Sequence, residues 1–406
     1  MAKWEMVRLN DVVDESITGE WGTECIDVEF GTKILRTTNF TNSGVINYNN
    51  ITVRNIPKNK IEKKKLLKND IILEKSGGSE NQPVGRVVFF ELDSKDTFLC
   101  NNFTQILRIN KRIALPRYIF LYLFRLHQNG TTELLQNKTT GIRNLQVKRY
   151  MDIEIPLPPL PVQQQIADVL DRASDLIEKR KAQIAKLDLL IKSQFIEMFG
   201  DPVINPKGWE QSTIEDMCST IVDCPHTTPK YIKNGQYPCI RTSDLVDGYL
   251  AISSDTKYIG NEEYPERIKR HKPCHGDIIY SREGERFGIA AIIPENLTVC
   301  LGQRVMLLAP QKNKATSEYL WGALNSSSVY AQAKNSVGGA TSPHVNIKDI
   351  RNFKIIYPPL LLQNQFATIV AQANKSKFIM QQEMEKINIL YQALMQKCFK
   401  GEMYYE

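Results

Sequence analysis

Apolar residues recur at every seventh position along one stretch that contains neither glycine nor proline between Val162 and Gly200. This spacing is typical of a long helix that packs lengthwise on a second helix. A proline cluster that ends at Pro161 precedes the stretch, and proline suits only the first turn of a helix. The pattern therefore predicts a helix from Pro161 to Met198, about 57 Å long at about 1.5 Å per residue. The repeating positions are Leu170, Ile177, Ile184, Ile191 and Met198, flanked by Ala173, Leu176, Leu187 and Leu190.

The same pattern returns two hundred residues later. Pro358-Pro359-Leu360 opens a second copy, in which Gln363 and Gln365 correspond to Gln163 and Gln165. Leu361 stands where Pro161 stands, which leaves the start of the second helix open. Two helices with matching seams most simply pack on each other, so we expect an antiparallel pair. The second seam is Val370, Lys377, Met384, Tyr391 and Cys398, with a companion row of Phe366, Ala373, Met380, Ile387 and Leu394.

Two seam positions are polar. Arg180 and Lys377 fall in or beside the apolar rows. A polar residue in a seam fixes the register of two helices, whereas the alternative is that both side chains face solvent or a partner. Both interpretations stay open at this point.

The segments that precede the two helices are β-rich and also repeat, each strand following a polar turn. The fold class is therefore α+β, with two pseudo-repeated domains joined by two long antiparallel coiled-coil helices. We expect two β-rich globular domains at 1–155 and 200–356, and helical spacers at 156–199 and 357–406. The matched segments are Leu35–Asn39 with Ile240–Asp244, Asn69–Leu73 with Gly276–Tyr280, Leu99-Cys100 with Val299-Cys300, and Tyr118–Phe120 with Tyr319–Trp321.

Composition places the chain among ordinary soluble proteins. Of its 406 residues, 42% are hydrophobic and 24% charged. No apolar run approaches the roughly 20 residues that cross a bilayer, and the first residues lack a secretion signal. The eight cysteines are scattered, as expected of reduced thiols in a cytoplasm. A net charge of +7 permits a polyanionic partner, and the basic run from Lys58 to Lys68 fits a solvated face and phosphate contact equally well.

Catalytic motifs are weak. Gly77-Gly78 and Gly338-Gly339 lack the lysine of a phosphate-binding loop, so we interpret them as tight loops. Asp70 with Glu74-Lys75 loosely matches a nuclease carboxylate cluster, but the second copy has Ser281-Arg282 at that place. Because no cofactor-binding or acid-base motif stands out, we expect no cofactor in this chain and no enzymatic activity. Six residues suggest zinc ligands, but their spacings do not form paired knuckles, so we expect no metal. They are Cys218, Cys224, His226, Cys239, Cys274 and His275.

Two copies of one scaffold with divergent loops suit a bipartite linear target such as DNA. The arrangement resembles the specificity subunit of type I restriction-modification systems over the full chain. The resemblance is carried by Leu157-Pro158-Pro159-Leu160-Pro161 with Gln163–Ala167, by the heptads that follow, by the Phe199-Gly200-Asp201-Pro202 junction and by the second copy of this pattern.

The resemblance implies a reader of DNA sequence without chemistry of its own. Each domain would read one half of a split site in double-stranded DNA. The helices would set the gap and bind two DNA adenine methyltransferase subunits, which use S-adenosylmethionine. Two restriction (motor-nuclease) subunits, which use ATP and Mg²⁺, would complete the assembly.

Base edges and phosphates are contacted by Arg, Lys, Asn, Gln, Ser and Thr, and four such segments occur in each half. Arg143, Arg282 and Arg286 are the best candidates for guanine, with a surface ion pair as an equal alternative for each. If Arg282 reads a base, Arg282→Ala should cost about 1–3 kcal/mol. Arg36 and Arg241, at equivalent positions, are expected to contact phosphate or hold the fold. The candidates are Lys33, Arg36, Thr37, Thr38, Asn39, Lys75, Ser76, Gly77, Gly78, Asn101, Asn102, Thr139, Thr140 and Arg143 in the first half, and Arg241, Thr242, Ser243, Arg282, Arg286, Gln303, Arg304, Thr341, Ser342 and His344 in the second.

Two alternatives remain. The halves could bind proteins instead of DNA, as a two-headed adaptor. The chain could also be an autonomous enzyme, which the missing cofactor and nucleotide motifs disfavour. Salt-dependent binding of one bipartite duplex separates the first alternative from DNA recognition.

Overall fold

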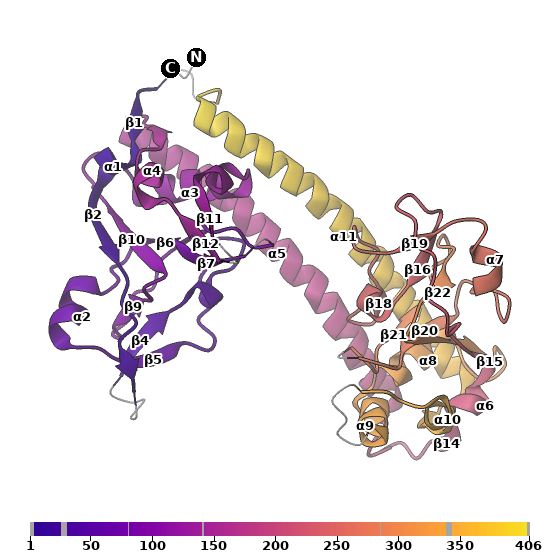
Figure 1. Cartoon of the computed structure of the whole chain (residues 1–406). Helices are drawn as coiled ribbons and strands as arrows, with labels where there is room; N and C mark the ends of the chain where they lie inside the picture. The colour runs from indigo at the N-terminus through magenta and orange to yellow at the C-terminus, as the bar shows by residue number, and fades with distance from the viewer. Residues whose placement is uncertain are drawn as a thin grey trace. The chain divides into compact units, whose positions relative to one another are not determined.

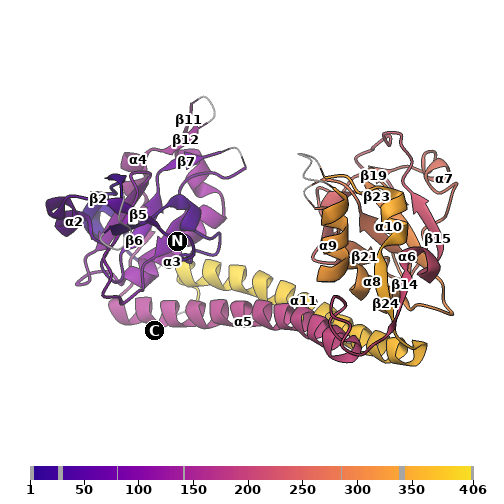
Figure 2. The same cartoon turned by 90° about the horizontal axis from the view of Figure 1, so that it is seen from below.

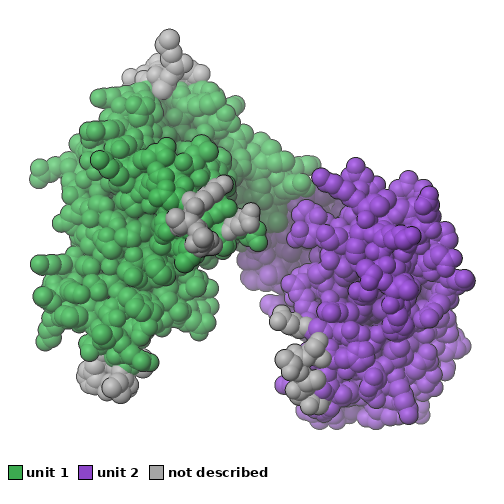
Figure 3. Space-filling view, in the orientation of Figure 1, with its two compact units in different colours: residues 1–179, 384–406 green, residues 180–383 purple. Residues whose placement is uncertain are grey.

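The computed structural model divides into two compact units, residues 1–179 with 384–406 and residues 180–383 (Figures 1 and 3). Each unit therefore contains one β-rich domain and a part of both long helices. The structure describes residues 4–25, 31–79, 81–139, 142–284, 286–337 and 343–403.

The first unit is built on a four-stranded antiparallel sheet ordered β2-β10-β6-β8. Its strands are β1 (Met6–Arg8), β2 (Val13–Thr18), β3 (Thr23–Glu24), β4 (Thr32–Leu35), β5 (Thr52–Asn55), β6 (Ile71–Glu74), β7 (Ser76–Gly78), β8 (Val87–Phe89), β9 (Phe98–Cys100), β10 (Thr104–Ile109), β11 (Gln136–Thr139), β12 (Ile142–Leu145) and β13 (Glu154–Pro156). Its helices are α1 (Leu9–Val12), α2 (Lys58–Lys64), α3 (Pro116–Gln128) and α4 (Val147–Met151), with 3-10 turns η1 (Thr37–Asn39) and η2 (Thr131–Leu135).

The second unit repeats this plan around a sheet ordered β15-β23-β20-β21. Its strands are β14 (Glu210–Thr213), β15 (Cys218–Asp223), β16 (Tyr237–Ile240), β17 (Leu245–Val246), β18 (Tyr249–Leu250), β19 (Tyr258–Ile259), β20 (Ile278–Ser281), β21 (Ala290–Ile292), β22 (Cys300–Leu301), β23 (Val305–Pro310) and β24 (Lys354–Tyr357). Its helices are α6 (Ile214–Met217), α7 (Tyr264–Arg267), α8 (Ser317–Leu324), α9 (Ser327–Ser336) and α10 (Ile347–Asn352), with the 3-10 turn η3 (Thr242–Asp244).

The predicted repeat is present at the level of strand pairing. Each domain closes its ends with one antiparallel pair, β1 with β13 and β14 with β24. Each also has one parallel pair, β4 with β9 and β16 with β22. The α+β class and the duplicated architecture are thereby confirmed.

One detail of the predicted repeat is wrong by a residue. In the parallel ladders, Leu35 lies opposite Cys100 and Ile240 lies opposite Leu301. The equivalent of Cys100 is therefore Leu301 and not Cys300. A short apolar run offers no local feature that fixes its register, which the neighbouring strand decides.

The two long helices, α5 (Leu160–Phe199) and α11 (Leu360–Lys400), begin at equivalent residues despite the Pro161-to-Leu361 difference. They end before Gly200 and Gly401, whose φ angles of 84° and 73° lie in the left-handed region that glycine adopts without strain. Each long helix is therefore terminated by a glycine that directly follows its last residue.

The seam residues pack within each unit. In the first unit, Leu170 and Ile177 share a hydrophobic core with Tyr391. In the second unit, Ile191 packs with Val370. Because the start of α5 meets the end of α11, and its end meets the start of α11, the predicted antiparallel pair is confirmed (Figures 1 and 2). Ile184, Met384 and Ile387 are half-buried, whereas the flanking Leu176 and Leu190 are exposed and lie outside the seam.

Both polar seam residues find partners across the helix pair. Nη2 of Arg180 lies 3.0 Å from the Glu383 carboxylate. Nζ of Lys377 lies 2.8 Å from the Asp188 carboxylate. The structure therefore favours the interpretation in which these residues fix the register.

Candidate nucleic-acid interface

The four candidate segments of each domain converge on one edge through the same backbone hydrogen bonds. In the first unit, Asn101 N donates to Leu35 O, Lys75 N to Phe103 O, and Leu145 N to Lys75 O, at 2.8 to 2.9 Å. In the second, Gly302 N donates to Ile240 O at 2.7 Å, Arg282 N to Arg304 O at 3.1 Å, and Val345 N to Arg282 O at 2.9 Å. We call each of these meeting points the polar edge of its domain.

The 3-10 turn of each polar edge is fixed by an arginine. Arg36 N donates to Asn39 Oδ1 at 2.9 Å, and its Nη2 donates to Asn50 O at 3.2 Å. Arg241 repeats both contacts, to Asp244 Oδ2 at 2.8 Å and Asp255 O at 2.9 Å. Of the two roles expected for these arginines, the geometry favours holding the fold.

Two predicted asparagines are internal. Asn39 is buried and its Nδ2 donates to Asn47 O and Asn49 O at 3.0 and 3.2 Å. Asn101 is also buried, and its carbonyl accepts from Thr104 Oγ1 at 2.7 Å. Their placement suits the turn that each one closes, while neighbouring Thr38 and Asn102 are exposed.

A concave site of about 550 Å³ opens at the first polar edge. A buried ion pair stabilises its wall: Arg86 Nε and Nη2 donate to the two oxygens of Glu74 at 2.8 Å. The same guanidinium donates to Phe40 O and Thr37 O at 3.1 Å. The lining joins Thr37, Thr38 and Gly77 of the predicted set to Thr41, Asn42, Ser79, Gln82 and Arg86.

Beside this site, β11, β12 and β7 form a small antiparallel sheet, and the β11–β12 hairpin projects from the domain (Figure 2). Arg143 lies opposite Gly78, and a bulge follows at Asn144 opposite Ser76. A side chain at Gly78 would meet Gln82 O at 2.7 Å, so the backbone approach requires glycine there. Lys75 Nζ donates to Thr18 Oγ1 at 3.0 Å. Thr140 lies outside the described residues, and Thr139 ends β11.

Arg282 has partners for its whole guanidinium. Only 4% of the residue is exposed. Its Nε donates to Asp223 Oδ1 at 3.0 Å, and its Nη1 lies 3.0 Å from Glu283 Oε1 and 3.2 Å from His344 Nε2. This placement favours the ion-pair alternative for Arg282, because a bidentate guanine contact needs a free fork.

Exposed polar side chains lie at the same edge as Arg282. Arg304 occupies the β22–β23 turn at a φ of 69°, next to exposed Gln303. Arg286 is exposed, and its Nη1 donates to the carbonyl of Ser243 at 3.2 Å. His344 Nδ1 lies 2.9 Å from Glu283 Oε1. The structure therefore gathers these predicted residues at one edge, while Thr341 and Ser342 lie outside the described residues.

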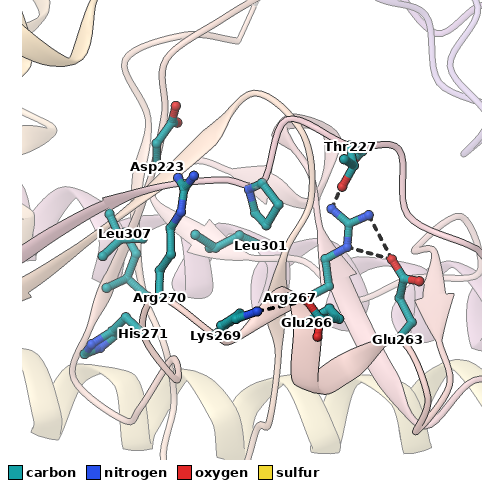
Figure 4. Close-up of a pocket in the computed structure, with 12 residues that line it drawn as sticks. Asp223, Thr227, Glu263, Glu266, Arg267, Lys269, Arg270, His271, Leu301 and Leu307 are labelled. Carbon is teal, nitrogen blue, oxygen red and sulfur yellow. Dashed lines mark hydrogen bonds and ion pairs between the residues drawn. The ribbon is translucent and has the colours of Figure 1, made fainter.

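A second hollow of about 230 Å³ adjoins Asp223 (Figure 4). Its buried cation is Arg267, whose Nε donates to Glu263 Oε1 at 2.9 Å and whose Nη1 donates to Thr227 O at 2.8 Å. Arg270 points toward Asp223 in Figure 4. Sequence reasoning missed this site because Thr227 lies 40 residues from Arg267 and the two residues form no local motif.

Three of the residues that suggested a nuclease or zinc site, Asp70, Glu74 and Cys218, are held inside the fold. Asp70 accepts from Arg108 Nε and Nη2 at 3.0 Å, and Glu74 holds Arg86, so neither carboxylate is free. Burial raises the pKa of Cys218 to about 12, which keeps the thiol protonated at neutral pH. Within the described ranges, no three His, Cys, Asp or Glu side chains gather as a metal site would require. Among the described helices, none combines the length and apolar character needed to span a bilayer.

Two copies of one α+β reader on a shared helix pair define a duplicated recognition protein. The chain belongs to the family of the type I restriction modification DNA specificity domain, whose model matches residues 1–187 and 206–388. It is 28% identical over 307 residues to the type I restriction enzyme MjaIX specificity subunit of Methanocaldococcus jannaschii, covering 70% of this chain and 68% of that one.

Other relatives span more of the chain. The EcoKI specificity subunit of Escherichia coli is 23% identical over 377 residues, covering 86% of this chain and 78% of the relative. The crystal structure of a type I restriction-modification S subunit from M. genitalium shares the fold with a TM-score of 0.56 at 14% identity, covering 98% and 96% of the two chains. The chain is therefore a specificity-subunit homologue with two recognition domains.

Proposed function

We propose that the chain reads a bipartite site in double-stranded DNA, one half with each polar edge. The observation that carries this proposal is the repeated backbone frame of the two polar edges combined with different side chains. The first edge presents Thr38 and Asn102, and the second presents Ser243 and Arg304. The same backbone arrangement with different exposed side chains suits two half-sites of different sequence in one DNA duplex.

Base reading falls to exposed side chains. Arg286 and Arg304 can offer a guanidinium fork to guanine, and Arg143 is the half-buried counterpart of the first edge. Arg282 instead braces three segments of the second edge through Asp223, Glu283 and His344. We assign it a positioning role.

The helix pair is proposed to dock two DNA adenine methyltransferase subunits. Leu189 and Leu190 on α5 are 62% and 47% exposed, and their repeat equivalents Ile389 and Leu390 on α11 are 64% and 67% exposed. Two equivalent apolar patches suit two copies of one partner, because isolated exposed leucines are common but a repeated adjacent pair is not.

Chemistry would reside in the partners. In this proposal the methyltransferase subunits hold S-adenosylmethionine, and restriction subunits, where present, hold ATP and Mg²⁺. The specificity chain contributes recognition and a fixed gap between half-sites.

The test is duplex binding by the chain assembled with its methyltransferase. We expect tight binding to one bipartite sequence, falling by about 10³ or more between 50 and 200 mM salt if six to ten phosphates are contacted. Arg304→Ala should weaken binding by about 1–3 kcal/mol and relax one base of one half-site. Lys312→Ala, exposed just after the end of β23 that lies opposite Arg304, serves as the control for loss of charge alone. Binding without sequence preference, or binding only to proteins, would instead favour the adaptor function.

A further inference from the structure

The β17–β18 hairpin of the second unit reaches from the polar edge to the helix pair. It begins directly after η3, the turn that carries Thr242 and Ser243. Its tip is Asp247-Gly248, with φ angles of 50° and 88°, which is the backbone of a tight hairpin turn. Trp321 Nε1 donates to the carbonyl of Gly248 at 2.7 Å and so fixes the tip against α8.

Past the tip, Tyr249 enters a three-residue contact with both long helices. Its hydroxyl donates to Asp188 Oδ1 on α5 at 2.8 Å. Lys377 on α11 donates to Asp188 Oδ1 and Oδ2 at 2.8 and 3.0 Å, and its Nζ lies 3.8 Å from the centre of the Tyr249 ring. Burial, followed by the Asp188 hydrogen bond, raises the pKa of Tyr249, so the hydroxyl remains a donor. We call Tyr249, Asp188 and Lys377 the hairpin clasp.

A second contact joins the domain to the helix pair further along. The rings of Tyr319, Phe195, Phe199 and Phe366 pack against one another, with centroids 5.0 to 5.9 Å apart. Eleven residues separate Asp188 from Phe199, and eleven separate Phe366 from Lys377. At about 1.5 Å per residue the two contacts lie about 16 Å apart along each helix. The Tyr249, Asp188 and Lys377 contact therefore adds a hydrogen-bonded link at a distance from the aromatic rings, and a link at that distance opposes rotation about them.

The first unit handles the corresponding segment differently. There the loop around Gly44 lies against Phe120 and Phe124 of α3, so that a side chain at Gly44 would meet Phe120 at 2.9 Å. Its polar link to the helix pair comes from α3 itself, where Arg117 Nη2 donates to Asp171 Oδ1 at 2.8 Å. The hairpin clasp is therefore particular to the second recognition domain.

We propose that the hairpin clasp sets the rotation of the second recognition domain on the helix pair and thereby determines which gap between half-sites is accepted. This inference rests on the proposed function. A domain of about 150 residues is about 35 Å across. A rotation of about 6° moves its far edge by about 3.4 Å, the rise of one base pair. A small change in this rotation is thus enough to admit a neighbouring gap.

The experiment uses the full chain assembled with its methyltransferase subunit and duplexes whose gap is the native length or one base pair shorter or longer. Tyr249→Phe removes one hydroxyl and Lys377→Met removes the cation. Tyr264→Phe is the matched control, because its buried hydroxyl has no hydrogen-bond partner among the described residues. Lys377→Arg, which keeps the charge, should retain the native behaviour.

We expect Tyr249→Phe and Lys377→Met to raise the methylation rate on the altered gaps, relative to the native gap, at least threefold, with Tyr264→Phe unchanged. Unaltered gap preference in both variants overturns the inference, even if their melting temperatures fall, because a purely structural role lowers stability without changing the preferred gap. If the unmodified complex shows no bipartite preference, the proposed function fails, and the inference fails with it.

Discussion

Gln163 and Gln363 occupy equivalent positions at the start of α5 and α11, and both side chains are fully buried. Gln163 accepts from Leu115 N at 2.7 Å and donates to Pro158 O at 2.8 Å. Gln363 accepts from Thr316 N at 3.0 Å and donates to Pro358 O at 2.9 Å. In each unit one carboxamide therefore joins the proline turn, the long helix and the segment that precedes α3 or α8.

Replacing this glutamine should destabilise its unit. Gln363→Met keeps the length of the side chain but leaves the amide of Thr316 and the carbonyls of Pro358 and Lys314 without their partner. We expect a loss of about 2–4 kcal/mol in the free energy of unfolding, since each buried group left unpaired costs about 1–3 kcal/mol. Urea unfolding measures it. Gln365→Met, two residues on and exposed, is the control and should change stability by less than about 0.5 kcal/mol. Equal effects of the two variants would contradict the role of Gln363 in joining these segments.

The buried Glu74–Arg86 pair gives a second prediction. The side chains are 2% and 10% exposed, so Arg86→Met leaves an unpaired carboxylate inside the first domain. Breaking such a pair costs about 3–5 kcal/mol. Lys65→Met, which breaks the exposed pair with Glu62, should cost at most about 1 kcal/mol. A stability of Arg86→Met close to that of the parent, measured in urea, would show that Glu74 is not held as described.

His127 makes the stability of the first domain depend on pH. Desolvation, and then the charge of Arg86, lower the pKa of His127 below its ordinary value of 6.5. The unfolded chain then takes up the proton at a higher pH than the folded chain does. Stability is therefore complete above about pH 6.5 and falls as the pH drops through that value.

His127→Asn should remove this part of the pH dependence while keeping a polar group near Thr132, which lies 3.0 Å from His127 Nδ1. The measurement is the urea midpoint at pH 7.5 and 5.5 for both proteins. Parallel losses on acidification in parent and variant would exclude His127 as the cause.

The two exposed patches on the helix pair predict the stoichiometry of assembly. Leu189→Glu with Leu190→Glu should abolish docking of one methyltransferase subunit, because charges buried in an apolar interface are strongly unfavourable. Ile389→Glu with Leu390→Glu should abolish the other. Native mass spectrometry should find complexes with one methyltransferase for each variant and two for the parent. Complexes with two subunits in both variants would exclude these patches as the docking sites.

Local periodicity explains what the sequence revealed. The heptad spacing predicts a helix from Pro161 to Met198, within one residue at each end of the observed α5, Leu160–Phe199. The prediction is accurate because a long seam repeats one signal many times. The matched turns, such as Arg36 with Arg241, placed equivalent segments at one edge because backbone turns are encoded by a few adjacent residues.

The sequence does not reveal contacts between residues that lie far apart along the chain. Asp223 and Arg282 are 59 residues apart, and the residues around them give no sign that the two side chains form an ion pair. Asp188, Tyr249 and Lys377 come from three separate segments and meet only in the folded domain. The apolar spacing also does not predict which helix residues are exposed, since Leu176 and Leu190 satisfy that spacing yet lie outside the packed seam.

The central claim is that each polar edge reads its own half of one split DNA site. Sequencing of methylated bases in a genome modified by this chain and its methyltransferase tests it most directly, with residues 200–356 exchanged for those of another family member. The account predicts one motif of two half-sites separated by a constant gap, in which the exchange alters one half and leaves the other half intact. A continuous motif, or an exchange that alters both halves, would contradict it.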